Sequence, residues 1–180
     1  MENFSAYIPT DLRFGKGCAG EIGVIARQYG KKALLIYGKG SVKKNGAYDT
    51  VVNSLKSAGI SIVEYGGIKS NPVIDDVRKA TKLGAESKAE MIIAVGGGSV
   101  IDSAKIISVS IPGNYDGWDI VKGKVQPSSA LPLLAVLTLA ATGTEMNPTG
   151  VVQNHETEEK LGYRNPLMFP RHSFLDPTFT

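Results

Sequence analysis

The 180-residue chain has a single cysteine, Cys18, which excludes an internal disulfide and any zinc site built from several cysteines. No stretch approaches the roughly 20 consecutive apolar residues that a membrane-spanning helix needs. The first residues, MENFSAYIPTDLRF, show no cationic segment followed by an apolar one, which is the pattern of a signal peptide. These absences predict a cytoplasmic protein with no membrane partner.

The chain also has little excess charge of either sign. Its 20 Lys and Arg against 17 Asp and Glu give a formal net charge of +3, and no basic block occurs. A nucleic acid partner is therefore not expected, although the mild positive balance suits a small anionic ligand. Glycine, by contrast, is abundant: 21 of the 180 residues are glycine, which is about 12%, whereas the usual content is about 7%. Such abundance indicates tight turns or backbone in close contact with a ligand.

Apolar and amphipathic runs alternate along most of the chain. Four apolar runs without strict alternation are predicted to be buried strands: 31–38, 60–68, 90–99 and 131–138. Three amphipathic runs between them are predicted to be helices: 41–59, 71–89 and 99–110. Strand–helix units in series predict an α/β fold, a Rossmann-like parallel sheet with helices on both faces.

The remaining segments are less regular. Residues 6–17 are predicted to form a short extended arm, and 114–129 a long polar connection. From residue 146 onward the chain is turn-rich, which predicts a C-terminal β-hairpin with loops. No repeat or low-complexity tract divides the chain, so residues 1–180 are predicted to be one domain.

The stretch IIAVGGGSVIDSAKII, residues 92–107, joins a predicted strand to a helix through three glycines. Backbone N–H groups and a helix N-terminus then meet at one point, an arrangement that favours phosphate. Ser99 is predicted to cap the helix, with Asp102 in the second position of a capping box. A plain capped turn is the alternative. The spacing is neither the G-x-G-x-x-G fingerprint nor a Walker A loop, for which Lys105 is misplaced.

Two further segments follow predicted strands. YGKGSVKKNG (37–46) is a second glycine turn, and LTLAATGTEMN (137–147) offers the hydroxyls of Thr138, Thr142 and Thr144. Ligands of open α/β sheets bind beyond the carboxyl ends of the strands. The three segments therefore predict one extended cleft for an anionic ligand, and a dinucleotide suits its length better than a single phosphate.

Taken together and in this order, these motifs resemble the iron-containing (group III) alcohol dehydrogenases, in particular the NADPH-dependent butanol dehydrogenase branch. PTDLRFGKG (9–17), WDIV (118–121), ETEEKLG (156–162) and LDPTFT (175–180) extend the resemblance over essentially the whole chain. The resemblance implies an N-terminal dinucleotide-binding domain, with the all-helical C-terminal domain of the family absent from this sequence.

The resemblance also implies which residues hold the cofactor. Gly97, Gly98 and Ser99 would contact its pyrophosphate, with Asp102 close by. Thr138 and Thr142 would line the adenosine side, and Asn71 and Lys160 would reach the riboses of the cofactor.

Gly38 stands where NAD-preferring relatives carry an acidic residue. An acid there would bind the ribose 2′-hydroxyl and repel a 2′-phosphate. With Gly38 in that place and Lys39 and Ser41 beside it, NADP(H) is expected to be favoured over NAD(H). The alternative for Lys39 is an ordinary solvated lysine of a turn.

The family's activity is hydride transfer between a primary alcohol or aldehyde and the nicotinamide. Its divalent metal, iron or possibly zinc, would lie in the absent domain, because neither His155 nor His172 matches the family's ligand motif. No catalytic residue or metal ligand is therefore predicted in this chain, and a homodimer formed through the N-terminal arm is expected. A stand-alone non-catalytic nucleotide-binding domain is one alternative. A flavodoxin-like binder of FMN or a phosphosugar, using Tyr115 and Trp118, is another.

Overall fold

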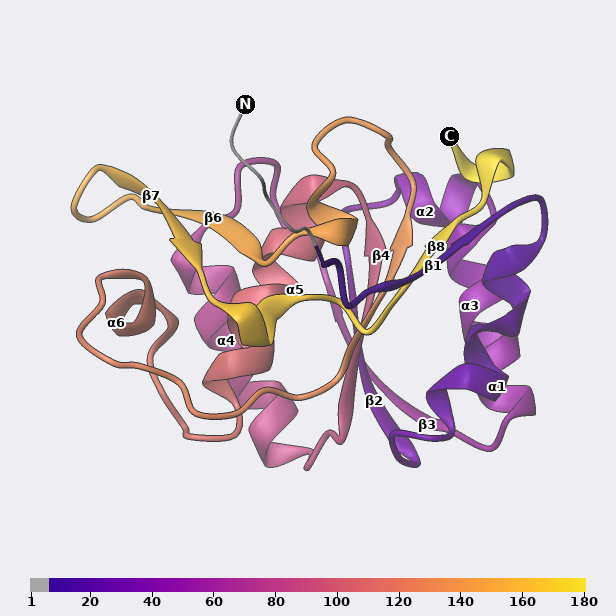
Figure 1. The fold of residues 1–180 in the computed structure, drawn as a ribbon, viewed down its shortest axis with the longest axis horizontal. Coiled ribbons are helices and arrows are strands. Elements are labelled where there is room, and N and C mark those ends of the chain that lie inside the picture. Colours follow the sequence, from indigo (N-terminus) through magenta and orange to yellow (C-terminus); the bar gives the residue numbers. More distant parts are fainter. Residues whose placement is uncertain (1–6) are drawn as a thin grey trace.

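The computed structural model describes residues 7–180, and a six-stranded parallel sheet forms its centre (Figure 1). The strand order is β1-β8-β5-β4-β2-β3, and every neighbouring pair is parallel. The strands are β1 Asp11–Phe14, β2 Lys32–Tyr37, β3 Ser61–Gly66, β4 Met91–Gly96, β5 Leu133–Leu137 and β8 His172–Leu175. The predicted Rossmann-like α/β fold is confirmed.

Helices cover both faces of this sheet. They are α1 Ile22–Ala26, α2 Ser41–Lys44, α3 Ala47–Ser57, α4 Ile74–Glu86, α5 Gly98–Ser110 and α6 Gly117–Val121. In Figure 1, α4, α5 and α6 lie on one side of the sheet, and α1 and α3 on the other. No helix within residues 7–180 has both the length and the apolar character needed to cross a bilayer.

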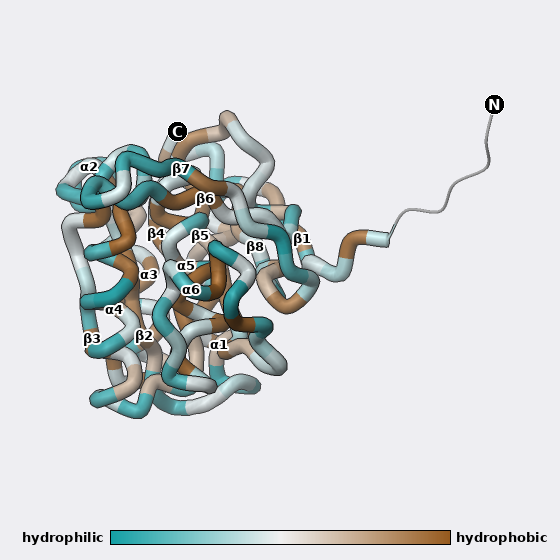
Figure 2. Tube along the Cα trace, turned by 90° about the vertical axis from the view of Figure 1, so that its left-hand side faces the viewer, coloured by the Kyte–Doolittle hydropathy of each residue, from teal (hydrophilic) through white to brown (hydrophobic). Residues whose placement is uncertain are grey.

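Alternate residues of the central strands feed two separate hydrophobic cores. Leu34 and Ile36 of β2 pack with α4 and α5, whereas Ala33 and Leu35 pack with α1 and α3. Strands buried on both faces need apolar residues at successive positions, which explains the continuous apolar runs of the sequence. Figure 2 shows the hydrophobic segments running through the interior and hydrophilic ones around the outside.

The predicted C-terminal hairpin is also present. β6 Thr149–Asn154 pairs with β7 Glu159–Arg164 in antiparallel fashion. β6 lies close to α5: a Cβ added to Gly150 of β6 would stand 3.1 Å from the carbonyl oxygen of Asp102 on α5. The hairpin therefore rests on the helix that the triple glycine opens.

Two elements of the sheet differ from the sequence expectation. β8 was not predicted, and residues 11–14 of the expected arm form the edge strand β1 paired with β8; residue 6 lies outside the described residues. Both strands have only four residues, too few for periodicity to reveal. Their place is fixed by contacts distant in sequence, such as the bond from Gly17 N to Asp176 Oδ2 at 2.8 Å.

Two helices also differ. The expected helix 41–59 is interrupted between α2 and α3, where Gly46 takes a φ of 83°. Asn45 donates from Nδ2 to the Phe179 carbonyl at 2.7 Å, which ties this break to the C-terminal segment. In the expected polar connection 114–129, Asp116 caps α6 by accepting from Trp118 N.

The importance of β8 for stability is testable at Phe174, which is fully buried in the core beneath α1 and α3. Phe174→Ala is expected to lower the free energy of unfolding by about 3–5 kcal/mol, because it leaves a cavity. Val24→Ala, at a side chain that is 77% exposed, is the control and should change it by less than about 0.5 kcal/mol. Urea unfolding measures both, and equal effects would contradict the placement of β8.

Candidate functional site

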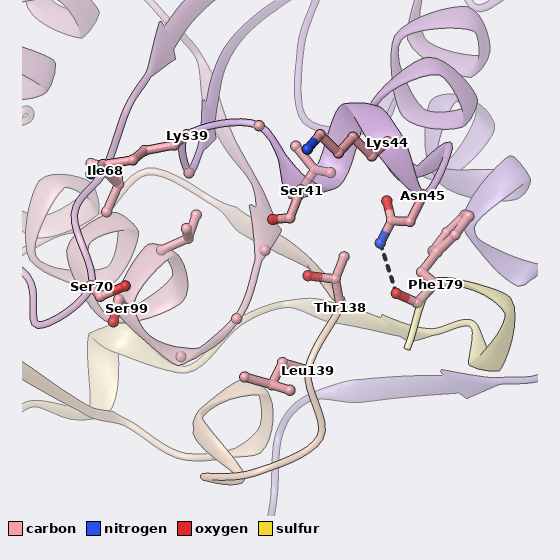
Figure 3. A pocket seen from close by; sticks show the side chains of 17 residues that line it. Lys39, Ser41, Lys44, Asn45, Ile68, Ser70, Ser99, Thr138, Leu139 and Phe179 are labelled. Atoms are coloured by element: carbon pink, nitrogen blue, oxygen red, sulfur yellow. Dashed lines mark hydrogen bonds between the residues drawn. The ribbon is translucent and has the colours of Figure 1, made fainter.

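A cleft of about 710 Å³ opens at the carboxyl edge of the sheet (Figure 3). Its walls follow the carboxyl ends of β2, β4 and β5, and its volume is within the usual range for a small-molecule site. The lining is formed by residues 38–42, 44, 45, 68, 70, 96–100, 138, 139 and 179. The three segments expected to meet at this edge therefore do so.

The floor of the cleft is the turn from β4 into α5. Helix α5 begins at Gly98 with Gly97 at the N-cap position, and no side chain caps it. The first N–H groups of a helix lack intrahelical partners, so these groups are available to an anion in the cleft. The expected capping role of Ser99 is wrong, because Ser99 lies inside the helix and its Oγ accepts from Asn71 N at 3.2 Å.

The glycine turn fits closely against the segment that follows β5. A Cβ on Gly98 would lie 3.0 Å from Thr142 Oγ1, and one on Gly97 would lie 3.4 Å from Leu139 Cβ. Gly38 differs, since a Cβ there would meet its nearest atoms at 3.8 Å. The close approach of Thr142 therefore favours glycine at 98, whereas position 38 has room for a side chain.

The cleft lining carries positive charge and no carboxylate. Lys39 and Lys44 both line it, whereas the Lys43 ammonium stands over the rings of Tyr37 and Tyr48, 5.1 and 4.6 Å from their centroids. An anionic ligand in this cleft would meet no opposing acid among the lining residues.

The structure brings most of the predicted site residues together. Seven of them line the cleft: Gly38, Lys39, Ser41, Gly97, Gly98, Ser99 and Thr138. Asn71 and Lys160 lie beside it as a pair, joined from Lys160 Nζ to Asn71 Oδ1 at 3.0 Å. Thr142 contacts the turn at Gly98. Their contacts with a cofactor stay predictions.

Asp102 is placed differently from the expectation. It makes no capping box with Ser99; its carboxylate accepts from Thr144 Oγ1 at 2.5 Å and from Val151 N at 3.1 Å. Burial raises the pKa of this carboxyl, and the two hydrogen bonds act against that shift. Asp102 therefore ties α5 to the segment after β5 and does not line the cleft.

Sequence reasoning missed some residues of the site. Lys44, Asn45 and Phe179 line the cleft and lie within the quoted motifs 37–46 and 175–180, but they were not named as site residues. Ile68 and Ser70 also line it, and no site motif contains them. The sequence pattern only excludes Lys105 as the lysine of a Walker A loop. In the structure its side chain is fully buried. A lysine in the apolar stretch VIDSAKIISV was the available signal, because lysine is rarely buried without partners.

The aromatic and histidine candidates lie elsewhere. Trp118 is buried on α6, and neither it nor Tyr115 lines the cleft. His155 lies in the hairpin turn, and His172 of β8 contacts Tyr29 Oη at 2.8 Å and Asp11 Oδ2 at 3.1 Å. Burial lowers the pKa of His172, and Asp11 opposes this effect. Within residues 7–180, no cluster of three or more His, Cys, Asp or Glu is arranged to hold a metal ion.

The comparisons with known proteins agree with this geometry. The family model described as iron-containing alcohol dehydrogenase matches residues 9–177. The chain belongs to this family. It is 46% identical to the probable NADH-dependent butanol dehydrogenase 1 of Bacillus subtilis, in a match that covers all of this chain and 47% of the relative. It is 39% identical to the NADPH-dependent aldehyde reductase YqhD of Escherichia coli, again over the whole chain and 46% of the relative.

Solved structures show the same relationship. The crystal structure of the NADH-dependent butanol dehydrogenase A of Thermotoga maritima superimposes with a TM-score of 0.95 at 46% identity. The superposition covers 98% of this chain and 45% of the Thermotoga chain. The present chain therefore spans about half the length of the relatives it matches and corresponds to their N-terminal part.

The close fit at the turn yields a prediction for Gly98→Ala. The added Cβ would press on Thr142, so binding of adenosine diphosphate is expected to weaken about tenfold, equivalent to about 1.4 kcal/mol. Gly20→Ala is the control, because a Cβ there meets no atom within 4 Å. Calorimetric titration measures both variants, and equal affinities would contradict the need for glycine at position 98.

Proposed function

We propose that this chain is the cofactor-binding part of an NAD(P)-dependent alcohol dehydrogenase or aldehyde reductase. The whole enzyme would transfer a hydride between a primary alcohol or an aldehyde and the nicotinamide. The observation that carries the proposal is the uncapped N-terminus of α5 at the floor of an acid-free cleft of dinucleotide size. The dehydrogenases and reductases to which the chain is similar support it over a stand-alone nucleotide-binding domain.

The residues of this chain would bind and orient the cofactor. The backbone N–H groups of Gly98 and Ser99 would hold the pyrophosphate, with Gly97 allowing its close approach. Asn71 and Lys160, already joined to each other, would contact a ribose. The nicotinamide, when bound, supplies the hydride acceptor or donor.

The described residues do not fit a metal centre, so no step through a metal is derived for this chain. The family's divalent metal would require ligands from elsewhere in the whole enzyme. We therefore expect residues 1–180 alone to bind nucleotide without oxidising an alcohol. Metal-dependent turnover by this chain alone would contradict that expectation.

For the cofactor type, we propose a preference for NADP(H). Gly38 offers no carboxylate to repel a 2′-phosphate, and Lys39, Ser41 and Lys44 of the same wall supply donors of hydrogen bonds and positive charge. Relatives carry both specificities in their names: NADH for the Bacillus enzyme and NADPH for the Escherichia coli enzyme. The preference therefore rests on these side chains.

Gly38→Asp tests this preference, because position 38 has room for the new side chain. Affinity for NADPH is expected to fall by about 10- to 100-fold through charge repulsion, while affinity for NADH holds or rises. Lys43→Ala is the matched control, because its ammonium is engaged by two tyrosine rings outside the lining.

Titration calorimetry of the unmodified chain with NADPH and then NADH tests both nucleotide binding and the NADP(H) preference. Binding of NADPH several-fold tighter than NADH supports both proposals. Tighter binding of NADH would contradict the NADP(H) preference alone. Binding of neither would contradict the nucleotide-binding function.

We also propose a homodimer formed through β1. This strand is one edge of the sheet, and it exposes Leu12 (42%) and Phe14 (76%). An edge strand with exposed apolar side chains is a template for pairing with another chain. Tyr7 and Ile8, just before it, are also exposed and apolar or aromatic.

Phe14→Lys is expected to convert the dimer to a monomer, because charge on an edge strand opposes pairing. Val24→Lys is the control, since Val24 on α1 is equally exposed at 77%. Light scattering after size exclusion gives the mass of each species. A monomeric wild-type chain at high concentration would refute the dimer.

A further inference from the structure

We propose that Lys105 is a positioning residue, which holds the segment 138–142 in place for the cofactor through Asn147 and Thr144. Thr138 and Leu139 of this segment line the cleft, and Thr142 lies against Gly98; the segment is called the wall below. The inference rests on the proposed nucleotide-binding function and deepens it. It assigns a role to a buried group that lies outside the cleft and belongs to none of the predicted contacts.

Lys105 sits two turns into α5 and has no exposed surface. Its ammonium donates three hydrogen bonds: to Thr144 Oγ1 at 2.7 Å, to Asn147 Oδ1 at 3.0 Å and to the Thr149 carbonyl at 2.8 Å. A protonated lysine has three N–H donors, and all three are used. Thr144 and Asn147 lie between β5 and β6, and Thr149 is the first residue of β6.

Asn147 connects Lys105 to the cleft wall through hydrogen bonds. Its Oδ1 accepts from Lys105 and from Thr149 N, and its Nδ2 donates to the Gly143 carbonyl at 3.0 Å. Gly143 directly follows the wall residue Thr142. Lys105 therefore fixes the far end of the wall, about 40 residues away along the chain.

The wall depends on its two ends. At the near end, Thr138 N donates to the Gly96 carbonyl at 3.1 Å. Among the described residues, the backbone N–H groups of 139–142 make no hydrogen bond of their own. Thr142 and Leu139 nevertheless lie against Gly98 and Gly97, where the pyrophosphate would bind. Loosening the Gly143 end would consequently disturb the cleft floor.

The charge of Lys105 is balanced within the same cluster. Asp102, one turn earlier on α5, accepts from the same Thr144 hydroxyl. Glu145 is also buried, and both carboxylates favour the ammonium form. Burial outweighs them and lowers the pKa of Lys105 to about 8. Above that pH the neutral amine has only two N–H donors, so one of the three tethers is lost.

Asn147→Ala is the variant of choice, because it cuts the link to Gly143 without leaving Asp102 and Glu145 unbalanced, as Lys105→Met would. NADPH binding at pH 7 is expected to weaken about five- to tenfold. Methyl order parameters of Leu139, Ala140 and Ala141 are expected to fall in the same variant. Ser110→Ala is the matched control: its buried hydroxyl lies on the same helix but bonds only to the Ile106 carbonyl.

A pH profile separates positioning from general stability. In the wild-type chain, NADPH affinity and the wall order parameters should both fall as the pH rises through about 8. In Asn147→Ala the order parameters should already be low and should change little over that range. Wall order parameters that fall with rising pH while NADPH affinity stays unchanged would overturn the proposal.

The remaining outcomes distinguish this inference from the proposed function. Asn147→Ala matching Ser110→Ala in affinity and order parameters would overturn the role of Lys105 while leaving nucleotide binding intact. If the wild-type chain binds neither NADPH nor NADH, the proposed function fails. Lowered order parameters in Asn147→Ala would then still support the anchoring of the wall, and unchanged ones would overturn it.

Discussion

The parallel pairing of β4 with β2 on one side and β5 on the other is the constraint on which the site depends. Val95 stands opposite Tyr37 of β2, and Gly96 stands opposite Leu137 of β5. The three strands therefore end level with one another, and the loops that follow them converge at one edge. The apolar residues that bury both faces of the sheet thus also determine where the cleft lies.

Helix α5 contributes to two parts of the cleft. Its glycine start leaves N–H groups free at the cleft floor, while Asp102 and Lys105, further along, fasten the segment between β5 and β6. One helix thereby supplies the uncapped end at the cleft floor and hydrogen bonds to the segment that follows β5. Buried charge is costly unless it is paired and hydrogen-bonded, and here every N–H donor of the Lys105 ammonium has a partner.

The sequence predicted those parts of the fold that local patterns govern. The four central strands, the three main helices and the C-terminal hairpin follow from hydrophobic runs and turn residues. β1 and β8 could not be predicted, because four-residue strands acquire their identity from partners distant in sequence. The glycine turn was recognisable from composition. The predicted capping role of Ser99 is wrong, because Ser99 lies inside the helix. Its hydroxyl accepts a hydrogen bond from Asn71 N, a tertiary contact that the local pattern does not reveal.

The proposed function requires the turn at residues 97–99 to bind the cofactor pyrophosphate. An NADPH titration of the ¹⁵N-labelled chain, followed by amide chemical shifts at pH 7, tests it most directly. We expect the largest shifts at Gly97, Gly98 and Ser99, with smaller ones at Gly38, Lys39 and Ser41. Saturable binding whose shifts avoid the 97–99 turn, for example shifts confined to the β6–β7 hairpin, would contradict it.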